Sequence, residues 1–219
     1  MDKLRLRFKK TGRAIYISHL DLMSTIQRAF SRAELPLKYS EGFNPRPQIS
    51  IALPLSVGTG SLCEILDFKL KDDTDLEELP ARLTAVLPEG IEIIEAYEPT
   101  RKASAIKWLE VGALMEYDER DISEMAGRLS AFYSADEIII TKKTKRGEGE
   151  TDIKPAIKTI EFTPAVGGVE LWALISAQEP TLNPELLTGA FRQKAPEIAP
   201  DFAKYTRLET YDSEMKVFR

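Results

Sequence analysis

The chain has 219 residues, of which 43% are hydrophobic and 30% are charged, and its net charge is −5. A single cysteine and a single histidine exclude an internal disulfide, a Cys/His zinc site and an iron–sulfur cluster held by this chain alone. No apolar run approaches the ~20 residues that span a bilayer, and the N-terminus lacks the apolar block of a signal peptide, so we expect a cytoplasmic protein with no membrane contact.

Basic residues are concentrated at the start of the chain. Residues 1–46 contain ten Lys/Arg and four Asp/Glu, a net charge of +6, which leaves −11 for the remainder. Because binding depends on the local field, such a segment can bind a polyanion even in an acidic protein. A solvated strand and helix face would show the same composition, so both interpretations stay open.

The first half of the chain alternates between strand and helix patterns. Residues 3–9 alternate with a period of two, with Leu4, Leu6 and Phe8 on one face and Lys3, Arg5, Arg7 and Lys9 on the other, which predicts a half-buried strand. We expect residues 14–17 to extend the sheet. A helix is predicted over 19–34, ended by Pro36, and a second over 73–86, where Pro80 indicates a late start or a kink. Further strands are predicted at 47–53, 63–70 and 91–98.

The second half repeats this order of elements. Helices are predicted at 121–135 and from Asn183-Pro184 onward, with Pro in the first turn. Strands are predicted at 107–117, 137–141, 156–162, 169–176 and 204–211. The order β-α-β-β-α-β is the ferredoxin-like, or split βαβ, pattern. The sequence therefore predicts an α+β fold of two tandem ferredoxin-like domains, 1–98 with a basic face and 107–219, joined near 98–106.

Ser18, His19, Leu20 and Asp21 form a short motif at the start of the first predicted helix. A serine, an acid three residues later and an apolar run are typical of a capping box, in which the Ser18 hydroxyl accepts a hydrogen bond from the amide of Asp21. A carboxylate at this position also complements the helix dipole. Capping therefore accounts for Ser18 and Asp21 without any catalytic role.

Capping does not account for His19. The first turn of a helix disfavours a cation, and a neutral imidazole can act as a general base. Structural, ligand-contacting and catalytic interpretations of His19 stay open. One histidine is too little for a metal site, and no metal is expected.

Arg28 and Arg32 are four residues apart on the same predicted helix. Their like charges cost a few tenths of a kcal/mol unless an anion lies between them. Guanidinium groups suit bidentate contacts with phosphate or carboxylate. Glu34 and Glu41 are alternative partners, so a simple ion pair is also consistent with the pattern.

Residues 41–48, EGFNPRPQ, form the most unusual loop of the chain. Pro45 and Pro47 stiffen the backbone on both sides of Arg46. A rigid loop that presents Asn44, Arg46 and an aromatic ring suits ligand recognition, with Phe43 as a stacking platform. The alternative is a stiff connection in which Phe43 belongs to the core.

Two further loops carry weaker signals. Gly58 and Gly60 precede a strand but lack the Lys-Ser/Thr of a P-loop, so a β-turn is favoured over a phosphate cradle. The basic loop that contains Lys142, Lys143, Lys145 and Arg146 is either a solvated hairpin tip or a second polyanion contact.

Several runs of residues can be compared with known families. They are Tyr16–Asp21, Gln27–Ala29, Leu35–Pro45, Pro54–Gly58 and Glu64, with Asp152–Pro155 in the second half. Together they resemble the radical-SAM-linked protein family, a domain of unknown function encoded beside, or fused to, a B12-binding radical SAM protein. The chain departs from that pattern at Ser31, where a second basic residue is usual, and at Arg46, where histidine is frequent.

The resemblance implies a partner rather than a reaction. The partner would be a radical SAM protein of the B12-binding type, and it would hold the S-adenosylmethionine, the iron–sulfur cluster and the cobalamin. This chain would hold no cofactor. Members of the family often lie near genes for a ribonuclease of the E/G type and for ribosomal proteins, which points to RNA.

We therefore expect an accessory module that binds RNA or another anionic substrate and has no catalytic activity of its own. Its expected binding surface combines basic, polar and aromatic residues: Arg5, Arg7, Lys9, Ser18, His19, Asp21, Arg28, Arg32, Tyr39, Phe43, Asn44 and Arg46.

Two alternatives come from other functional classes. A metal-independent endoribonuclease, with an architecture similar to CRISPR repeat-processing enzymes, would use His19 as base, Tyr16 or Lys38 as assistant and Arg28 to stabilise the phosphorane. A protein–protein scaffold would instead place the acidic part of the chain against a basic partner. The oligomeric state is left open.

Overall fold

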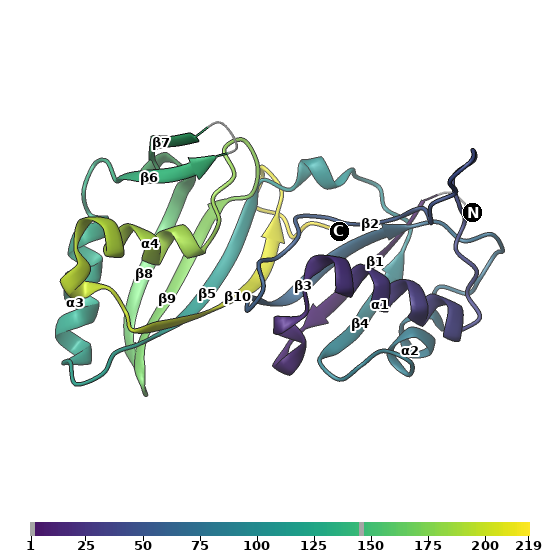
Figure 1. Ribbon diagram of the computed structural model, residues 1–219, viewed down its shortest axis with the longest axis horizontal. Coiled ribbons are helices and arrows are strands. Elements are labelled where there is room, and N and C mark those ends of the chain that lie inside the picture. Colours follow the sequence, from purple (N-terminus) through teal and green to yellow (C-terminus); the bar gives the residue numbers. More distant parts are fainter. Residues whose placement is uncertain (1–2, 145–146) are drawn as a thin grey trace. The chain divides into compact units, whose positions relative to one another are not determined.

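The computed structural model describes residues 3–144 and 147–219, and the protein is a mixed α+β chain with four α-helices in those residues (Figure 1). It divides into two compact units, one up to Ala103 together with Arg219 and one over Ser104–Phe218. None of the helices in the described part of the chain is long and apolar enough to cross a membrane.

The first unit places two helices on a four-stranded antiparallel arrangement. Its strand order is β4-β1-β3-β2, and each neighbouring pair runs antiparallel. In chain order its elements are β1 (Leu4–Lys10), the 3-10 helix η1 (Gly12–Tyr16), α1 (His19–Arg32), β2 (Ile49–Ile51), β3 (Gly60–Phe68), α2 (Leu79–Thr84) and β4 (Ile91–Tyr97).

The core of the first unit lies between these helices and one face of the sheet. Leu4, Leu6 and Phe8 of β1 are fully buried, as their alternation predicts. Ile26 and Phe30 of α1 join the same cluster, and the rings of Phe30 and Phe68 lie 5.0 Å apart. Each such side chain contributes roughly 1.5–3 kcal/mol on burial, so the apolar stripe is what holds α1 on the sheet.

Residues 14–17 do not extend the sheet, so that expectation was wrong. Residues 14–16 belong to η1 and Ile17 caps it; Ala14 N donates to Thr11 O, and Ile17 N donates to Ala14 O. Gly12 adopts a φ of 56°, which turns the chain away from the direction of β1. Further along, α2 begins only at Leu79 with Pro80 in its first turn, which confirms the late start among the two options for the 73–86 helix.

The second unit repeats the arrangement with one addition. Its strand order is β10-β5-β9-β8, again with antiparallel neighbours, while β6 and β7 form a separate hairpin. The 3-10 helix η2 (Ala103–Ala105) spans the boundary between the units in the chain. The elements that follow are β5 (Trp108–Glu116), α3 (Ile122–Tyr133), β6 (Ile139–Thr144), β7 (Gly147–Asp152), η3 (Lys154–Ala156), β8 (Ile157–Ala165), β9 (Gly168–Ser176), α4 (Glu185–Lys194), η4 (Pro196–Ile198) and β10 (Phe202–Tyr211).

The predicted buried strand at 137–141 therefore lies in a hairpin outside the main sheet. The side chain of Asp152 anchors the base of this hairpin, because its Oδ1 accepts from the amides of both Ile138 and Lys154. The core of the second unit is aromatic: the rings of Phe132, Tyr133 and Phe191 meet at centroid distances of 5.1–5.5 Å.

Candidate anion-binding groove

A groove of about 700 Å³ lies beside the C-terminal half of α1. One wall is the polar side of this helix, formed by Ser24, Gln27, Arg28 and Ser31. Their spacing of i, i+3, i+4 and i+7 places all four on one side, opposite the buried stripe. The Ser31 hydroxyl donates to the carbonyl of Gln27 at 3.3 Å, so its oxygen can still accept a hydrogen bond.

The segment that follows α1 forms the other wall. Glu34 adopts a φ of 55°, and the amide of Leu35 donates to the carbonyl of Phe30, so the chain reverses direction at the helix end. Leu35 and Leu37 then fix this segment in the core.

Lys71 reaches the groove through tertiary pairing. Leu37 pairs with Leu70, and the amide of Lys71 donates to the carbonyl of Pro36 at 2.9 Å. Lys71 comes from the segment after β3, more than thirty residues from the rest of the lining. Only the folded chain brings it beside α1.

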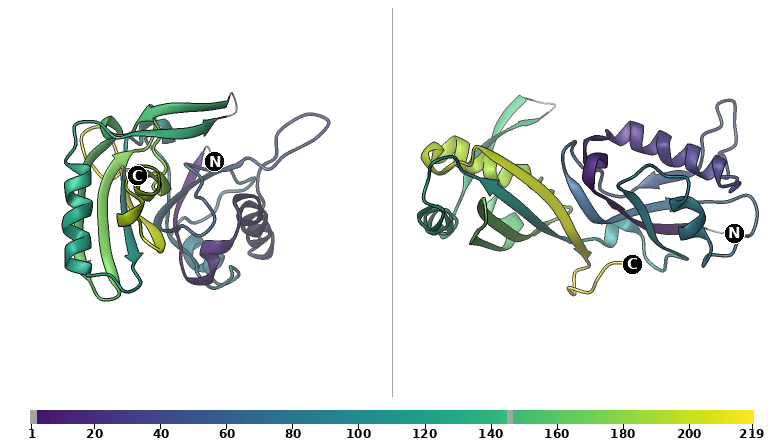
Figure 2. Two further views of the ribbon diagram at one scale, coloured as in Figure 1. Left: turned by 60° about the vertical axis from the view of Figure 1, so that its left-hand side comes forward. Right: turned by 90° about the horizontal axis from the view of Figure 1, so that it is seen from below.

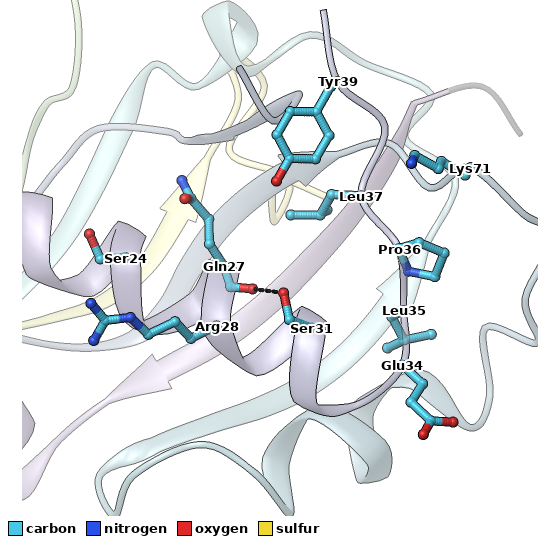
Figure 3. A pocket seen from close by; sticks show the side chains of 10 residues that line it. All are labelled: Ser24, Gln27, Arg28, Ser31, Glu34, Leu35, Pro36, Leu37, Tyr39 and Lys71. Atoms are coloured by element: carbon cyan, nitrogen blue, oxygen red, sulfur yellow. Dashed lines mark hydrogen bonds between the residues drawn. The ribbon is translucent and has the colours of Figure 1, made fainter. Parts of the chain in front are cut away.

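The lining of the groove favours an anion. Arg28 and Lys71 lie at opposite ends, with the amide of Gln27 and the hydroxyl of Tyr39 between them (Figure 3). Neither Arg28 nor Lys71 forms an ion pair with any residue that the structure describes. Glu34 supplies the single carboxylate of the described lining. The groove thus offers a guanidinium group, an ammonium group and several neutral donors to one ligand.

Residues Ser40–Arg46 form a projecting arm (Figure 2) that directly follows Tyr39, a residue of the groove lining. Its root is held by hydrogen bonds, because Ser40 N donates to Arg46 O at 2.8 Å and Arg46 N donates to Ser40 Oγ at 3.0 Å. Tyr39, which lines the groove, pairs with Pro47 at the same root. Phe43 is fully exposed, so the option that placed it in the core was wrong. Asn44 and Arg46 are exposed with it.

The motif Ser18–Asp21 begins α1 as the capping pattern predicts. Ser18 Oγ accepts from the amide of Asp21 at 3.2 Å and donates to Asp21 Oδ2 at 2.7 Å. His19 is the first residue of the helix and is partly exposed, and Tyr16 is 65% exposed beside it in the chain.

His19 and Arg28 do not share a site. Nine positions along one helix correspond to a rise of about 13 Å and a rotation of about 180°. The side chain of His19 is therefore attached near the N-terminal end of α1, on the side opposite to Arg28. The two side chains cannot act together on one phosphate, as the endoribonuclease alternative requires.

Arg5 is not on a solvent-exposed face, so its place in the expected binding surface was wrong. The residue is completely buried, and its guanidinium donates to both carboxylate oxygens of Asp67, at 2.6 and 3.2 Å. Lys3 pairs with the same carboxylate. Strand alternation separates the two faces of a sheet but does not tell whether the second face is covered.

The other charged residues of β1 are also engaged within the fold. Lys9 pairs with Glu92 at 3.4 Å, and Arg7 is half-buried. Burial lowers the pKa of Lys10, whose ammonium donates to the carbonyl of Ile15 at 3.1 Å, and nearby Glu64 opposes that shift. Burial likewise raises the pKa of Tyr97. The basic side of β1 is therefore part of the fold rather than a free cationic stripe.

Arg32 is not among the residues that line the groove, and its contact with an anion beside Arg28 stays a prediction. Its guanidinium donates to the carbonyl of Val86 at 2.7 Å and so ties α1 to the end of α2. Of the basic loop in the second unit, Lys145 and Arg146 lie outside the described residues. Within the described ranges, no group of three or more His, Cys, Asp or Glu side chains is placed to hold a metal ion.

The sequence pattern left several groove residues unassigned. Ser24, Gln27 and Ser31 could have been found from their helical spacing with Arg28, because a polar stripe opposite a core stripe marks an exposed helix face. Lys71 carried no local signal, since its position depends on the pairing of distant segments.

Among solved structures, the chain is similar at 12% identity and a TM-score of 0.49 to a chain described as "Crystal Structure of a Cbf5-Nop10-Gar1 Complex". That similarity covers 94% of this chain and 48% of the other, so this chain spans about half the length of that one. A second is described as "Crystal Structure of an Unknown Protein from Galdieria sulphuraria", at 11% identity and a TM-score of 0.27, over 93% of this chain and 95% of that one. No curated protein matches this chain.

A family model matches residues 3–184, which include both walls of the groove and the arm. It describes an uncharacterized protein conserved in bacteria. The chain therefore belongs to the DUF2344 family of bacterial proteins.

Proposed function

We propose that this chain is an accessory binding module that holds RNA, through its phosphates, in the groove beside α1. The observation that carries the proposal is the pair of cations, Arg28 and Lys71, at the two ends of a groove whose other polar groups are neutral apart from Glu34. The module works in the cytoplasm and has no catalytic activity of its own.

The chemistry of the lining suits phosphate. A guanidinium group makes bidentate contacts with phosphate oxygens, whereas a lysine supplies a point charge that tolerates several geometries. The hydroxyls of Ser24 and Tyr39 and the amide of Gln27 add neutral donors. A groove of about 700 Å³ is also in the size range of sites that enclose an organic ligand.

The architecture and the partner are further parts of this proposal. Two tandem ferredoxin-like domains, 1–98 and 107–219, are supported by the strand orders β4-β1-β3-β2 and β10-β5-β9-β8, each with a helix after its first and third strands. A radical SAM partner of the B12-binding type is supported by the resemblance of Tyr16–Asp21 and Leu35–Pro45 to the radical-SAM-linked family.

The test is a salt titration of RNA binding by the intact chain. The wild type is expected to retain RNA at low salt, with an affinity that falls as salt rises. The variant Arg28→Ala/Lys71→Ala is expected to bind more weakly and to reduce the slope of log K against log salt by about 0.7 for each phosphate that is no longer neutralised.

The matched control is Arg192→Ala/Lys194→Ala, which removes the same charges from exposed positions at the end of α4. It is expected to leave the slope unchanged. Absence of salt-sensitive retention, or an equal weakening in the control, would overturn the proposal.

A further inference from the structure

We propose that the arm Ser40–Arg46 stacks an unpaired base on the ring of Phe43, so that the ligand of the groove is single-stranded rather than duplex RNA. This inference rests on the proposed function. It assigns the arm a role that the charge of the groove alone does not imply, because phosphate contacts are available on single strands and duplexes alike.

The backbone on either side of Phe43 is restrained. Two hydrogen bonds between Ser40 and Arg46 close its root, and Gln48 N donates to the carbonyl of Lys38 just below them. Pro45 and Pro47 restrict the returning strand, and Gly42, with a φ of 115°, makes the turn. A backbone restrained in this way loses less conformational freedom when a ligand binds, which lowers the cost of recognition.

Phe43 has no role in the fold. Its side chain is fully exposed, and it makes no ring contact with any described residue. Leaving a phenylalanine in water forgoes roughly 1.5–3 kcal/mol of burial. Both faces of the ring are therefore free to stack with a planar group.

The arm is continuous with the groove through Tyr39. Tyr39 lines the groove and also pairs with Pro47 at the root of the arm. Phe43 is four residues further on, at most about 14 Å along an extended chain. A strand whose phosphates contact Arg28 and Lys71 can thus reach the ring with a neighbouring nucleotide.

The surroundings of Phe43 favour a nucleic-acid base over an apolar protein pocket. The exposed neighbours include the amide of Asn44 and the guanidinium of Arg46, which can hydrogen-bond a base edge and contact a phosphate. Glu41 is the acidic residue of the arm, and together with Lys38 and Arg46 it leaves residues 38–46 with a net positive charge. A base presents a π face with polar edges, which matches one aromatic ring among polar groups.

The experiment measures binding of a labelled RNA oligonucleotide, single-stranded and as the duplex of the same sequence, to the intact chain. Wild type is expected to bind the single strand more tightly than the duplex. Phe43→Ala is expected to weaken single-strand binding roughly 5- to 150-fold, the range for removal of one stacked base. Its salt slope should equal that of the wild type, because every side chain that binds a phosphate is still present.

Two further variants separate stacking from apolar contact. Phe43→Tyr keeps the π face and is expected to bind within about twofold of wild type, whereas Phe43→Leu keeps an apolar side chain and is expected to resemble Phe43→Ala. Since Phe43 is fully exposed, the variants should fold like wild type, which circular dichroism checks.

The outcomes distinguish this inference from the proposed function. If binding is salt-sensitive and requires Arg28 and Lys71, but Phe43→Ala or Phe43→Leu binds like wild type, the arm does not stack a base and the groove proposal stands. Equal affinity for the single strand and the duplex would likewise overturn the stacking role of the arm and leave the groove proposal standing. Absence of RNA binding overturns both, and a Phe43-dependent effect seen only with vesicles of anionic lipid assigns the arm to a membrane surface instead.

Discussion

Each unit has a groove at the C-terminal end of its first helix, and the two grooves differ in chemistry. The groove beside α1 is polar and carries Arg28 and Lys71. The groove beside α3 is smaller, about 480 Å³, and most of its lining is apolar. Its described lining residues are Ala131, Phe132, Ala135, Glu137, Ile138, Ile139 and Lys194.

The segments after these two helices differ in the same way. The arm after α1 presents a free aromatic ring. By contrast, Ile138, which precedes β6, and Ile140 within β6 are both buried. Similar strand orders therefore carry different surfaces. The candidate site is therefore a property of a few residues around α1 and not of the strand order that the units share.

Both units bury charged side chains: the first buries Arg5, Asp67 and Lys10, and the second buries Arg207 and Asp212. The second unit also buries tyrosine hydroxyls that each have an acceptor. Tyr205 donates to Thr188 Oγ1 at 2.7 Å, and Tyr117 donates to the carbonyl of Ile198 at 3.0 Å. The ion pair of the first unit and the tyrosines of the second predict separate effects on stability.

The largest expected loss of stability follows from breaking the buried ion pair of the first unit. Asp67→Ala leaves the guanidinium of Arg5 buried without its carboxylate, and we expect a decrease of about 3–5 kcal/mol in the free energy of unfolding. Glu92→Ala removes the partner of Lys9 at an exposed pair and should cost less than about 1 kcal/mol. Urea denaturation of both variants measures the difference, and equal decreases would contradict the role of the buried pair.

The next effect on stability appears at alkaline pH and concerns Tyr205 of the second unit. Burial raises the pKa of Tyr205 to about 12 from 10.0. The unfolded tyrosine releases its proton from about pH 10 while the folded one keeps it, so stability falls as pH rises between 10 and 12, by about 2–3 kcal/mol for this group.

Tyr205→Phe should make this fall shallower, whereas Tyr16→Phe, at a 65% exposed position, should leave it unchanged. Denaturation midpoints between pH 9 and 12 provide the measurement. A wild-type curve that is flat over this range would show that the buried hydroxyl does not control alkaline stability.

The smallest expected loss of stability concerns a feature that the two units share, the capping of their first helices. Ser18 caps α1 and Asp121 caps α3, each by accepting the amide three residues later, at 3.2 and 2.9 Å. Ser18→Ala and Asp121→Ala should each cost about 1 kcal/mol.

His19→Ala should change stability by less than about 0.5 kcal/mol, because its side chain is partly exposed and has no hydrogen-bond partner among the described residues. Thermal unfolding of the three variants is the measurement. A destabilisation at His19 as large as that at Ser18 would show that the imidazole supports the helix start.

Much of the fold follows from local patterns in the sequence. The alternation of Leu4, Leu6 and Phe8 predicts β1, and the Ser18–Asp21 motif predicts the first residue of α1, because both signals lie within a few neighbouring residues. Residues 14–17 were misassigned because a short apolar run does not distinguish a strand from a turn of 3-10 helix.

The candidate site could be predicted only in part. The arm could be predicted from the sequence because glycine and proline restrict the backbone locally around Phe43 and Arg46. The place of Lys71 in the groove could not be predicted, because it depends on the pairing of Leu37 with Leu70. The burial of Arg5 could not be predicted either, because it depends on Asp67 from a distant strand. Interactions between remote segments leave no periodic signal in the sequence.

The most direct test of the central claim is ultraviolet crosslinking of single-stranded RNA to the intact chain, followed by identification of the crosslinked peptides. Crosslinks are expected at Phe43 and Tyr39, with a yield that decreases in Arg28→Ala/Lys71→Ala and is unchanged in Arg192→Ala/Lys194→Ala. Crosslinks confined to the second unit, for example to the β6–β7 hairpin, would contradict the claim that the groove and arm beside α1 form the binding site.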